Sequence, residues 1–239
     1  MKTTLFIIIV LISGCFAGLI HGGLNLVLVE PYLDQAIGIE NQTLFATGEE
    51  EDTTSFWVEY NSYRAWQKGG QVLAGAILGT SIAALVGIVF LFVRKSLPEG
   101  NNVKKMLILS GLMWFTIFVI PFLKYPANPP TVGDAETVVM RGILFLSFIA
   151  ISGLGAIAFY QVYNKIQNKK FLAFVGYATF ISVAFFLLPG NPDEITAPTE
   201  LVEGFRGASF VAVSVYWLTL ALILGGFVEK LQERLNLKR

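Results

Sequence analysis

Six long apolar runs restrict this chain to one class of fold. Each run has roughly the 20 residues that an α-helix needs to cross the hydrocarbon core of a bilayer. The runs cover residues 5–29, 70–93, 106–123, 138–163, 171–188 and 205–227. Of the 239 residues, 54% are hydrophobic and 14% are charged, which is too apolar for an ordinary soluble domain. The sequence therefore predicts an all-α integral membrane protein with a single transmembrane domain, a bundle of six helices packed through Gly, Ala and Ser.

The first apolar run admits two interpretations. It follows Met1-Lys2 directly, and Ile12-Ser13-Gly14-Cys15 has the form of a lipoprotein cleavage box, so the segment could be a cleaved signal. The apolar pattern nevertheless continues beyond Cys15 to Val29, which makes the run long enough to span a bilayer. We therefore expect a retained membrane helix, with cleavage as the alternative.

Small and polar residues share one face of this first helix. Their three- and four-residue spacing places Gly14, Ala17, Gly18, His21, Gly22 and Asn25 on the same side. Small residues in such a row let two membrane helices approach closely. His21 and Asn25 could simply hydrogen-bond across a helix contact. Alternatively, His21 could be a transient metal ligand, since neutral imidazole binds divalent transition metals and ionisable groups inside a membrane are usually functional.

Residues 30–69 form the longest polar stretch, which we expect to be an acidic extracytoplasmic loop. Its centre carries the acidic run Glu49-Glu50-Glu51-Asp52. Such a run is typical of a solvated linker, but it could also concentrate cations near the mouth of a transport path. Glu30, at the outer end of the first helix, is a further candidate metal ligand.

The charged residues predict how the chain is oriented in the membrane. If the alternate connectors and both termini are assigned to one side, that side holds 12 of the 17 basic residues and only three of the 17 acidic residues. Basic residues near helix ends favour the cytoplasm, so we expect a multi-pass cell-membrane protein with both termini cytoplasmic and residues 228–239 as a charged cytoplasmic tail. Five basic residues fall on the outer side: Arg64, Lys68, Lys124, Arg141 and Arg206. These could extend their side chains to the interface or pair with acidic residues such as Asp134, Glu136, Glu200 and Glu203.

The connector between the third and fourth runs is the most unusual sequence in the chain. Residues 121–142 read PFLKYPANPPTVGDAETVVMRG and hold four of the nine prolines. Each proline fixes φ, lacks an N–H and restricts the residue before it, so we expect a rigid, irregular segment at the membrane boundary. Asp134 and Glu136 are its candidate oxygen ligands for a metal ion. The other candidate pathway or structural residues are Asn25, Lys124, Tyr125, Pro126, Asn128, Pro129, Arg141 and Arg206.

Three stretches also carry a resemblance to a known family. PFLKYPANPPTVGDAET closely resembles the signature of the CbtA family, the predicted membrane subunit of a cobalt transporter, and the weaker stretches GCFAGLIHGG and YRAWQKGG support it. The resemblance implies a polytopic protein for cobalt uptake, with the cobalt ion as transported substrate, and often a small one-helix partner subunit.

A weak internal repeat links two of the outer connectors. Residues 125–129 (YPANP) lead to Arg141-Gly142 and a new helix, and residues 188–192 (LPGNP) lead to Arg206-Gly207 and a new helix. The pattern suggests three helical hairpins in parallel repeat, since transporter folds often arise from internal repeats. Alternatively, membrane exits and entries collect these residue types independently.

The motifs that are absent narrow the function. The chain has no GxxxxGK[ST], CxxC or HExxH motif and no basic face, so we expect neither ATP hydrolysis, a structural zinc site, a cofactor nor nucleic-acid binding. The leading interpretation is uptake of a divalent metal ion across a lipid bilayer, with no enzymatic activity; assembly into a homo- or hetero-oligomer is left open. Two alternatives remain: an accessory or scaffold subunit of a larger membrane complex, and a membrane enzyme that uses Lys124, Asp134, Glu136 and Arg141.

Overall fold

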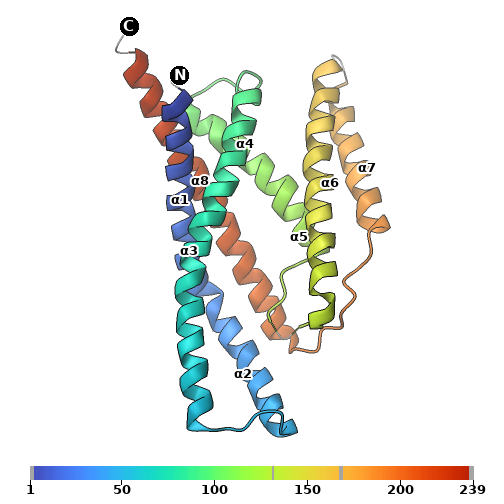
Figure 1. Cartoon of the computed structure of the whole chain (residues 1–239). Helices are drawn as coiled ribbons and strands as arrows, with labels where there is room; N and C mark the ends of the chain where they lie inside the picture. The colour runs from blue at the N-terminus through green and yellow to red at the C-terminus, as the bar shows by residue number, and fades with distance from the viewer. Residues whose placement is uncertain (1–2, 131, 167–168, 237–239) are drawn as a thin grey trace. The chain divides into compact units, whose positions relative to one another are not determined.

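The computed structural model describes residues 3–130, 132–166 and 169–236, and within these ranges the chain contains helices and connectors but no strand (Figure 1). The helices are α1 (Thr3–Leu28), α2 (Glu30–Thr47), α3 (Thr54–Val93), α4 (Asn102–Trp114), the π-helix η1 (Phe115–Val119), α5 (Ile120–Lys124), the 3₁₀ turn η2 (Ala135–Thr137), α6 (Val138–Lys165), α7 (Phe171–Leu187) and α8 (Thr199–Asn236). The all-helical class expected from the sequence is confirmed for the described residues. The last three residues of the expected tail lie outside them.

Five helices are long and apolar enough to cross a membrane. They are α1, α3, the continuous helix Asn102–Lys124, α6 and α8. The sixth expected span corresponds to α7, which is apolar but has 17 residues, near the lower end of the length that spans a bilayer. The helical, multi-pass architecture is therefore established, while the count of six spans and the three hairpin repeats stay predictions.

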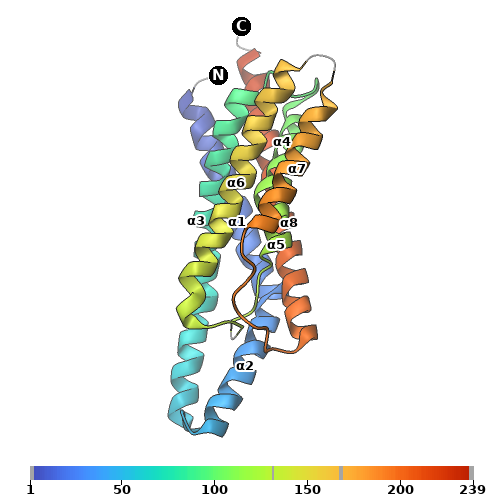
Figure 2. The same cartoon turned by 90° about the vertical axis from the view of Figure 1, so that its right-hand side faces the viewer.

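The chain divides into two compact units, each of which has its own packing. The first comprises residues up to Gly111 together with those from Thr199 onward, and the second comprises Leu112–Pro198. In the first unit, α1 packs side by side with both α3 and α8 (Figure 1). In the second unit, α6 and α7 pack against each other, and α6 also contacts η1 and α5 (Figure 2).

Backbone-to-backbone contact between α1 and α3 holds the first unit together. A Cβ atom added to Gly18 would overlap the carbonyl oxygen of Gly75, and one added to Gly14 would overlap that of Gly79. Gly22 lies equally close to the backbone of Val72. The small-residue face expected on the first helix is thus confirmed as a close helix contact, which only glycine permits at this separation.

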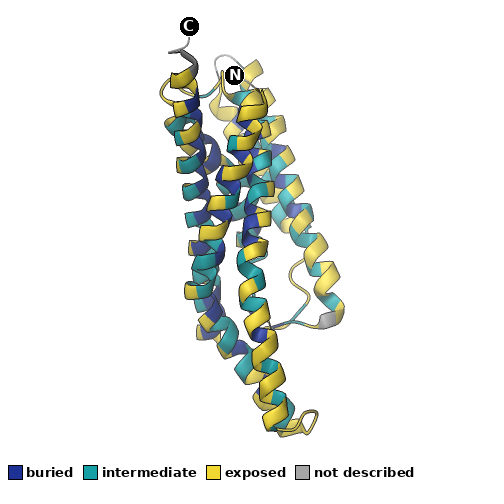
Figure 3. Cartoon of the chain, turned by 60° about the vertical axis from the view of Figure 1, so that its left-hand side comes forward, coloured by how far each residue is buried: buried dark blue, intermediate teal, exposed yellow. Residues whose placement is uncertain are grey.

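α8 supplies much of the core of the first unit. Its buried side chains recur every three or four residues and include Tyr216, Leu220 and Leu224. The Tyr216 hydroxyl donates to the Gly79 carbonyl of α3 at 2.9 Å, so the polar end of a large buried side chain is satisfied. Figure 3 shows the buried positions along the contacting faces and exposed positions on the opposite faces. Many exposed residues are large and apolar, as expected where a helix faces lipid.

The stretch 30–69 needs a correction, because most of it is helical. α1 ends before Pro31, whose missing N–H and bulky ring prevent the helix from continuing unbroken, and α2 begins there with the proline in its first turn. α2 ends at Gly48, whose φ of 75° is the left-handed conformation typical of a helix C-terminus. α3 begins at Thr53, whose hydroxyl accepts the Phe56 N–H. Only residues 48–53 form an irregular connection, and they contain the acidic run.

Candidate functional site

His21 is half-buried where α1 faces α8, and both of its ring nitrogens have hydrogen-bond partners. Nδ1 is 3.2 Å from the carbonyl oxygen of Ala212 in α8, and Nε2 is 3.3 Å from the side-chain nitrogen of Asn25. A carbonyl only accepts and an amide nitrogen only donates, so Nδ1 carries the proton and Nε2 uses its lone pair. The ring of Tyr216 lies beside the imidazole, with centroids 5.7 Å apart. A metal ion would reach His21 by replacing the Asn25 amide at Nε2.

Glu30 belongs to an ion-pair network between α2 and α3. Arg64 donates to Glu30 Oε2 at 2.5 Å and to Asp34 Oδ1 at 2.8 Å. Lys68 donates to Asp34 Oδ2 and Gln71 donates to Glu30 Oε1, both at 2.7 Å. All four carboxylate oxygens therefore have donors, and the Glu30 side chain is only 7% exposed. Glu30 could bind a cation only by exchanging these partners.

The same network sets the ionisation of Asp34. Burial alone raises the pKa of this carboxyl, but the hydrogen bonds and positive charges of Lys68 and Arg64 outweigh burial and lower its pKa below the ordinary value. Asp34 is therefore an anion held by two cations at neutral pH. Sequence reasoning missed Asp34 as a site residue, although it lies four residues after Glu30, as Lys68 does after Arg64.

In the second unit, the start of the proline-rich connector docks on the segment after α7. The Tyr125 hydroxyl donates to the Pro189 carbonyl at 2.6 Å, and burial raises the pKa of Tyr125, which keeps the donor protonated. Lys124 Nζ lies 4.8 Å from the centre of the Phe185 ring, within the range of a cation–π contact. Pro126 and Asn128 are half-buried and Pro129 is buried. The expected irregular structure is confirmed for residues 125–130 and 132–134, whereas residues 121–124 belong to α5 and residues 135–142 form η2 and the start of α6.

Arg141 and Asp193 join the two connectors of this unit, one before α6 and one after α7. Arg141 Nε lies 2.9 Å from Asp193 Oδ2, and the Thr137 hydroxyl donates to the same oxygen at 2.9 Å. The Arg141 guanidinium also donates to the backbone carbonyls of Val132 and Asp134. The Asp193 side chain is 6% exposed, so this is a nearly buried ion pair. The acidic partners offered from the sequence for the basic residues were Asp134, Glu136, Glu200 and Glu203, and Asp193, which follows the second Asn-Pro pair directly, was missed.

The remaining site candidates have local partners. Asp134 and Glu136 are both exposed, and Asp134 Oδ1 accepts the backbone N–H of Glu136 at 3.0 Å in a turn that leads into α6. Arg206 lies in the first unit and donates to Glu203 at 2.8 Å, one turn earlier in α8. For Arg206 the structure thus has the ion pair that the sequence offered as an alternative to an interface position. The two arginines of the weak repeat, Arg141 and Arg206, thus pair in different ways.

The candidate metal ligands do not form one preassembled site. Among the described residues, no group of three or more His, Cys, Asp or Glu side chains could together hold a metal ion. His21 and Glu30 belong to the first unit, and Asp134 and Glu136 belong to the second. Each remains a separate candidate ligand.

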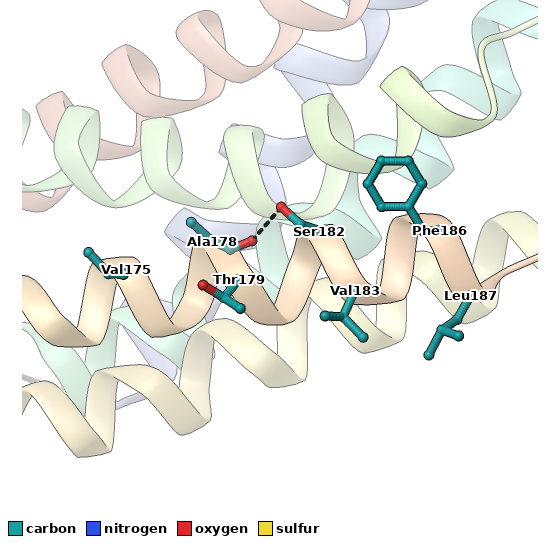
Figure 4. Close-up of a pocket in the computed structure, with 7 residues that line it drawn as sticks. All are labelled: Val175, Ala178, Thr179, Ser182, Val183, Phe186 and Leu187. Carbon is teal, nitrogen blue, oxygen red and sulfur yellow. Dashed lines mark hydrogen bonds between the residues drawn. The ribbon is translucent and has the colours of Figure 1, made fainter.

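The second unit also has a shallow apolar hollow on α7. Every residue that lines it belongs to this one helix, including Thr179, Ser182 and Phe186 (Figure 4). The Ser182 hydroxyl donates to the Ala178 carbonyl within the same helix at 2.8 Å, so it presents little polarity to the hollow. This is a helix surface and not an enclosed cavity that could bind a small molecule.

Comparison with protein families identifies the family of membrane proteins to which the chain belongs. The family model described as probable cobalt transporter subunit (CbtA) matches residues 3–229. The chain belongs to the CbtA family. Comparisons with curated proteins and with solved structures gave no significant match.

The region matched by the CbtA family model contains every candidate residue described above. His21 at one end and Arg206 at the other both fall within the matched region. The resemblance of the three short stretches is confirmed, and together with the apolar helices it makes the chain a multi-pass membrane protein of a transporter-subunit family.

Proposed function

We propose that this chain is the membrane subunit through which a divalent transition-metal ion, cobalt in the first instance, enters the cell. The family match over residues 3–229 is the observation that carries this proposal. The helices of spanning length supply the architecture that a transport path requires. The metal ion is the transported substrate, and the chain acts in a membrane complex that includes a small one-helix subunit.

The charges favour inward movement of a cation. In the proposed orientation both termini are cytoplasmic, and the outer side holds 14 of the 17 acidic residues. A negative inside potential adds about 2.3 kcal/mol per charge per 100 mV, so a divalent ion gains about twice that. The exposed carboxylates Asp134 and Glu136 are suited to exchanging the water shell of the ion at the outer surface.

His21 is the candidate for the intramembrane step. Its Nε2 lone pair is held only by the neutral Asn25 amide at 3.3 Å, a contact that a metal ion would replace at small cost. Sparse and separate ligands suit a transport path, because an ion that binds too tightly is not released.

Cobalt accumulation in cells that express the chain tests the proposal. We expect His21→Ala to reduce uptake at least about tenfold, as loss of a step worth about 1.4 kcal/mol would do. The double variant Asp134→Asn/Glu136→Gln should slow uptake at low cobalt concentration. Cys15→Ser is the matched control, because Cys15 lies on the same helix without being a candidate ligand.

The alternatives give different results in the same experiment. Uptake that appears only when a one-helix partner is co-expressed places the path in a complex. If wild-type protein gives no uptake with or without that partner, at verified membrane expression, the chain is an accessory subunit. Nickel measured in parallel shows whether the path distinguishes cobalt.

A further inference from the structure

The continuous helix from Asn102 to Lys124 changes its hydrogen-bond register just before a proline. Residues Phe115–Val119 form a π-helix, in which each N–H reaches back five residues. The Ile120 N–H accordingly donates to the Phe115 carbonyl. The next donor in this register would be residue 121, which would reach the carbonyl of Thr116. Residue 121 is proline and has no N–H, so the Thr116 carbonyl loses its donor within the helix.

A side chain from α6 occupies the position of that missing donor. The Ser152 hydroxyl donates to the Thr116 carbonyl at 2.5 Å, and Ser152 is completely buried. The Ser152 oxygen also lies 2.8 Å from the Tyr177 hydroxyl of α7. Because the Ser152 proton is committed to a carbonyl that can only accept, Tyr177 is the donor in the second contact, and its hydroxyl also lies 3.2 Å from the Ser152 carbonyl oxygen as a second acceptor. The hydrogen bonds therefore run in one direction, from Tyr177 to Ser152 to Thr116.

The connector begins one turn after the π-helical segment. α5 continues for one turn beyond Pro121 and ends at Lys124, and Tyr125 then makes its contact with Pro189. An unsatisfied carbonyl inside a bilayer is costly, so a helix with this proline keeps the π register most easily when another helix provides a donor. Ser152 is such a donor, and Tyr177 restricts the orientation of its hydroxyl.

We propose that Ser152 is a positioning residue for the outer connector: its hydroxyl replaces the N–H that Pro121 lacks, and Tyr177 orients that hydroxyl. The pair thereby holds the π-helical segment, and with it the turn of helix that leads into the connector. The importance of this position for uptake rests on the proposed function, whereas its effect on the folded protein does not.

A double-mutant cycle between Ser152 and Pro121 tests the assignment. Ser152→Ala should lower the melting temperature of the purified protein by several degrees, because the Thr116 carbonyl loses its donor. Pro121→Ala restores a backbone N–H at the required position. In the Pro121→Ala background, Ser152→Ala should therefore have less than half of its effect in the wild-type background.

Two further variants sharpen the cycle. Tyr177→Phe keeps the ring and removes the orienting hydroxyl, so we expect a smaller loss that Pro121→Ala also suppresses. Ser182→Ala is the matched control, because that hydroxyl bonds only within α7, and it should change little in either background. If Ser152→Ala alone does not yield folded protein, recovery of folded protein on adding Pro121→Ala supports the assignment.

Cobalt uptake measured on the same variants separates the two proposals. If the losses in stability caused by Ser152→Ala and Pro121→Ala are additive, the role of Ser152 is overturned, even if wild-type protein transports cobalt. Coupled losses in stability with no uptake by wild-type protein would support the role of Ser152 and overturn the proposed function. If both proposals hold, Ser152→Ala reduces uptake several-fold and the double variant recovers most of it.

Discussion

Gly133 shows how a single residue shapes the proline-rich connector. Its φ of 102° lies in the left-handed region that side chains other than glycine rarely adopt. A Cβ atom at this position would also overlap the Asp193 carboxylate and the Arg141 guanidinium. Backbone conformation and space thus both require glycine beside the ion pair that joins the two connectors.

We expect Gly133→Ala to destabilise the folded protein by about 1–3 kcal/mol, because it combines backbone strain with displacement of a nearly buried ion pair. The melting temperature of the detergent-purified protein measures this effect. Gly190→Ala is the control, since Gly190 lies in the other connector with no positive φ and open space around it. Equal effects of the two substitutions would contradict the role assigned to Gly133.

Residue types were easier to predict from the sequence than their partners were. The three-residue and four-residue spacing on the first helix correctly grouped the glycines of the α1–α3 contact, because helical periodicity alone fixes which residues share a face. The partner of Arg141 was not predictable, because Asp193 lies 52 positions further along the chain and reaches it only through packing. The metal-ligand roles of His21, Glu30, Asp134 and Glu136 stay predictions.

At the scale of elements, α2 and the first part of α3 are where the structure differs from the loop predicted from the sequence. A polar, acidic stretch between two apolar runs is usually a loop, but these residues form two helices linked at one end by ion pairs and near their connection by packed aromatic rings. Glu30 and Asp34 are four residues apart, as are Arg64 and Lys68, so each pair shares a helix face. That matched spacing was the feature of the sequence from which two ion-paired helices could have been predicted.

The ion-pair network predicts that stability depends on pH through Asp34. The pKa of Asp34 is lower in the folded protein than in the unfolded chain, so the unfolded chain binds more protons as the pH falls. The contribution of Asp34 is therefore present above about pH 4, the ordinary value for an aspartate, and is lost as the pH falls through the folded-state value. Because the side chain is 44% exposed, we expect a modest effect.

This contribution is measured by the melting temperatures of wild-type protein and Asp34→Asn between about pH 6 and pH 3. These limits lie roughly two units above and one unit below the ordinary pKa of an aspartate. Wild-type protein should be the more stable at pH 6, and the difference should shrink toward pH 3. Glu59→Gln removes an exposed carboxylate of the same hairpin and should leave the pH profile unchanged. A difference that stays constant over this range would show that Asp34 contributes through packing instead of charge.

At the scale of the whole molecule, the proposed orientation makes the most direct prediction. Glu50, between α2 and α3, should face outward, and Glu99, between α3 and α4, should face the cytoplasm. Both positions are exposed, and the chain has one cysteine, Cys15, so a Cys15→Ser background permits single-cysteine labelling.

In that background, a membrane-impermeant maleimide should label Glu50→Cys in intact cells and Glu99→Cys only after permeabilisation. The parent Cys15→Ser protein controls for background labelling. The reverse pattern would place both termini outside and would remove the charge argument for inward transport. Spanning length and loop charge made this prediction possible from the sequence, because both depend on composition and not on tertiary contacts. The division into two units could not be foreseen, since it depends on which helices pack together.

The short connection between α2 and α3 also offers a practical route to imaging a small membrane protein. Residues 49–52 are exposed and lie between a helix-ending glycine, Gly48, and a helix-starting threonine, Thr53. Exposed loop tips of this kind tolerate insertions, because little buried backbone is disturbed. An antibody epitope or a helical fusion domain inserted there would keep both helix caps. It would give single-particle microscopy a recognisable marker attached to the α2–α3 hairpin.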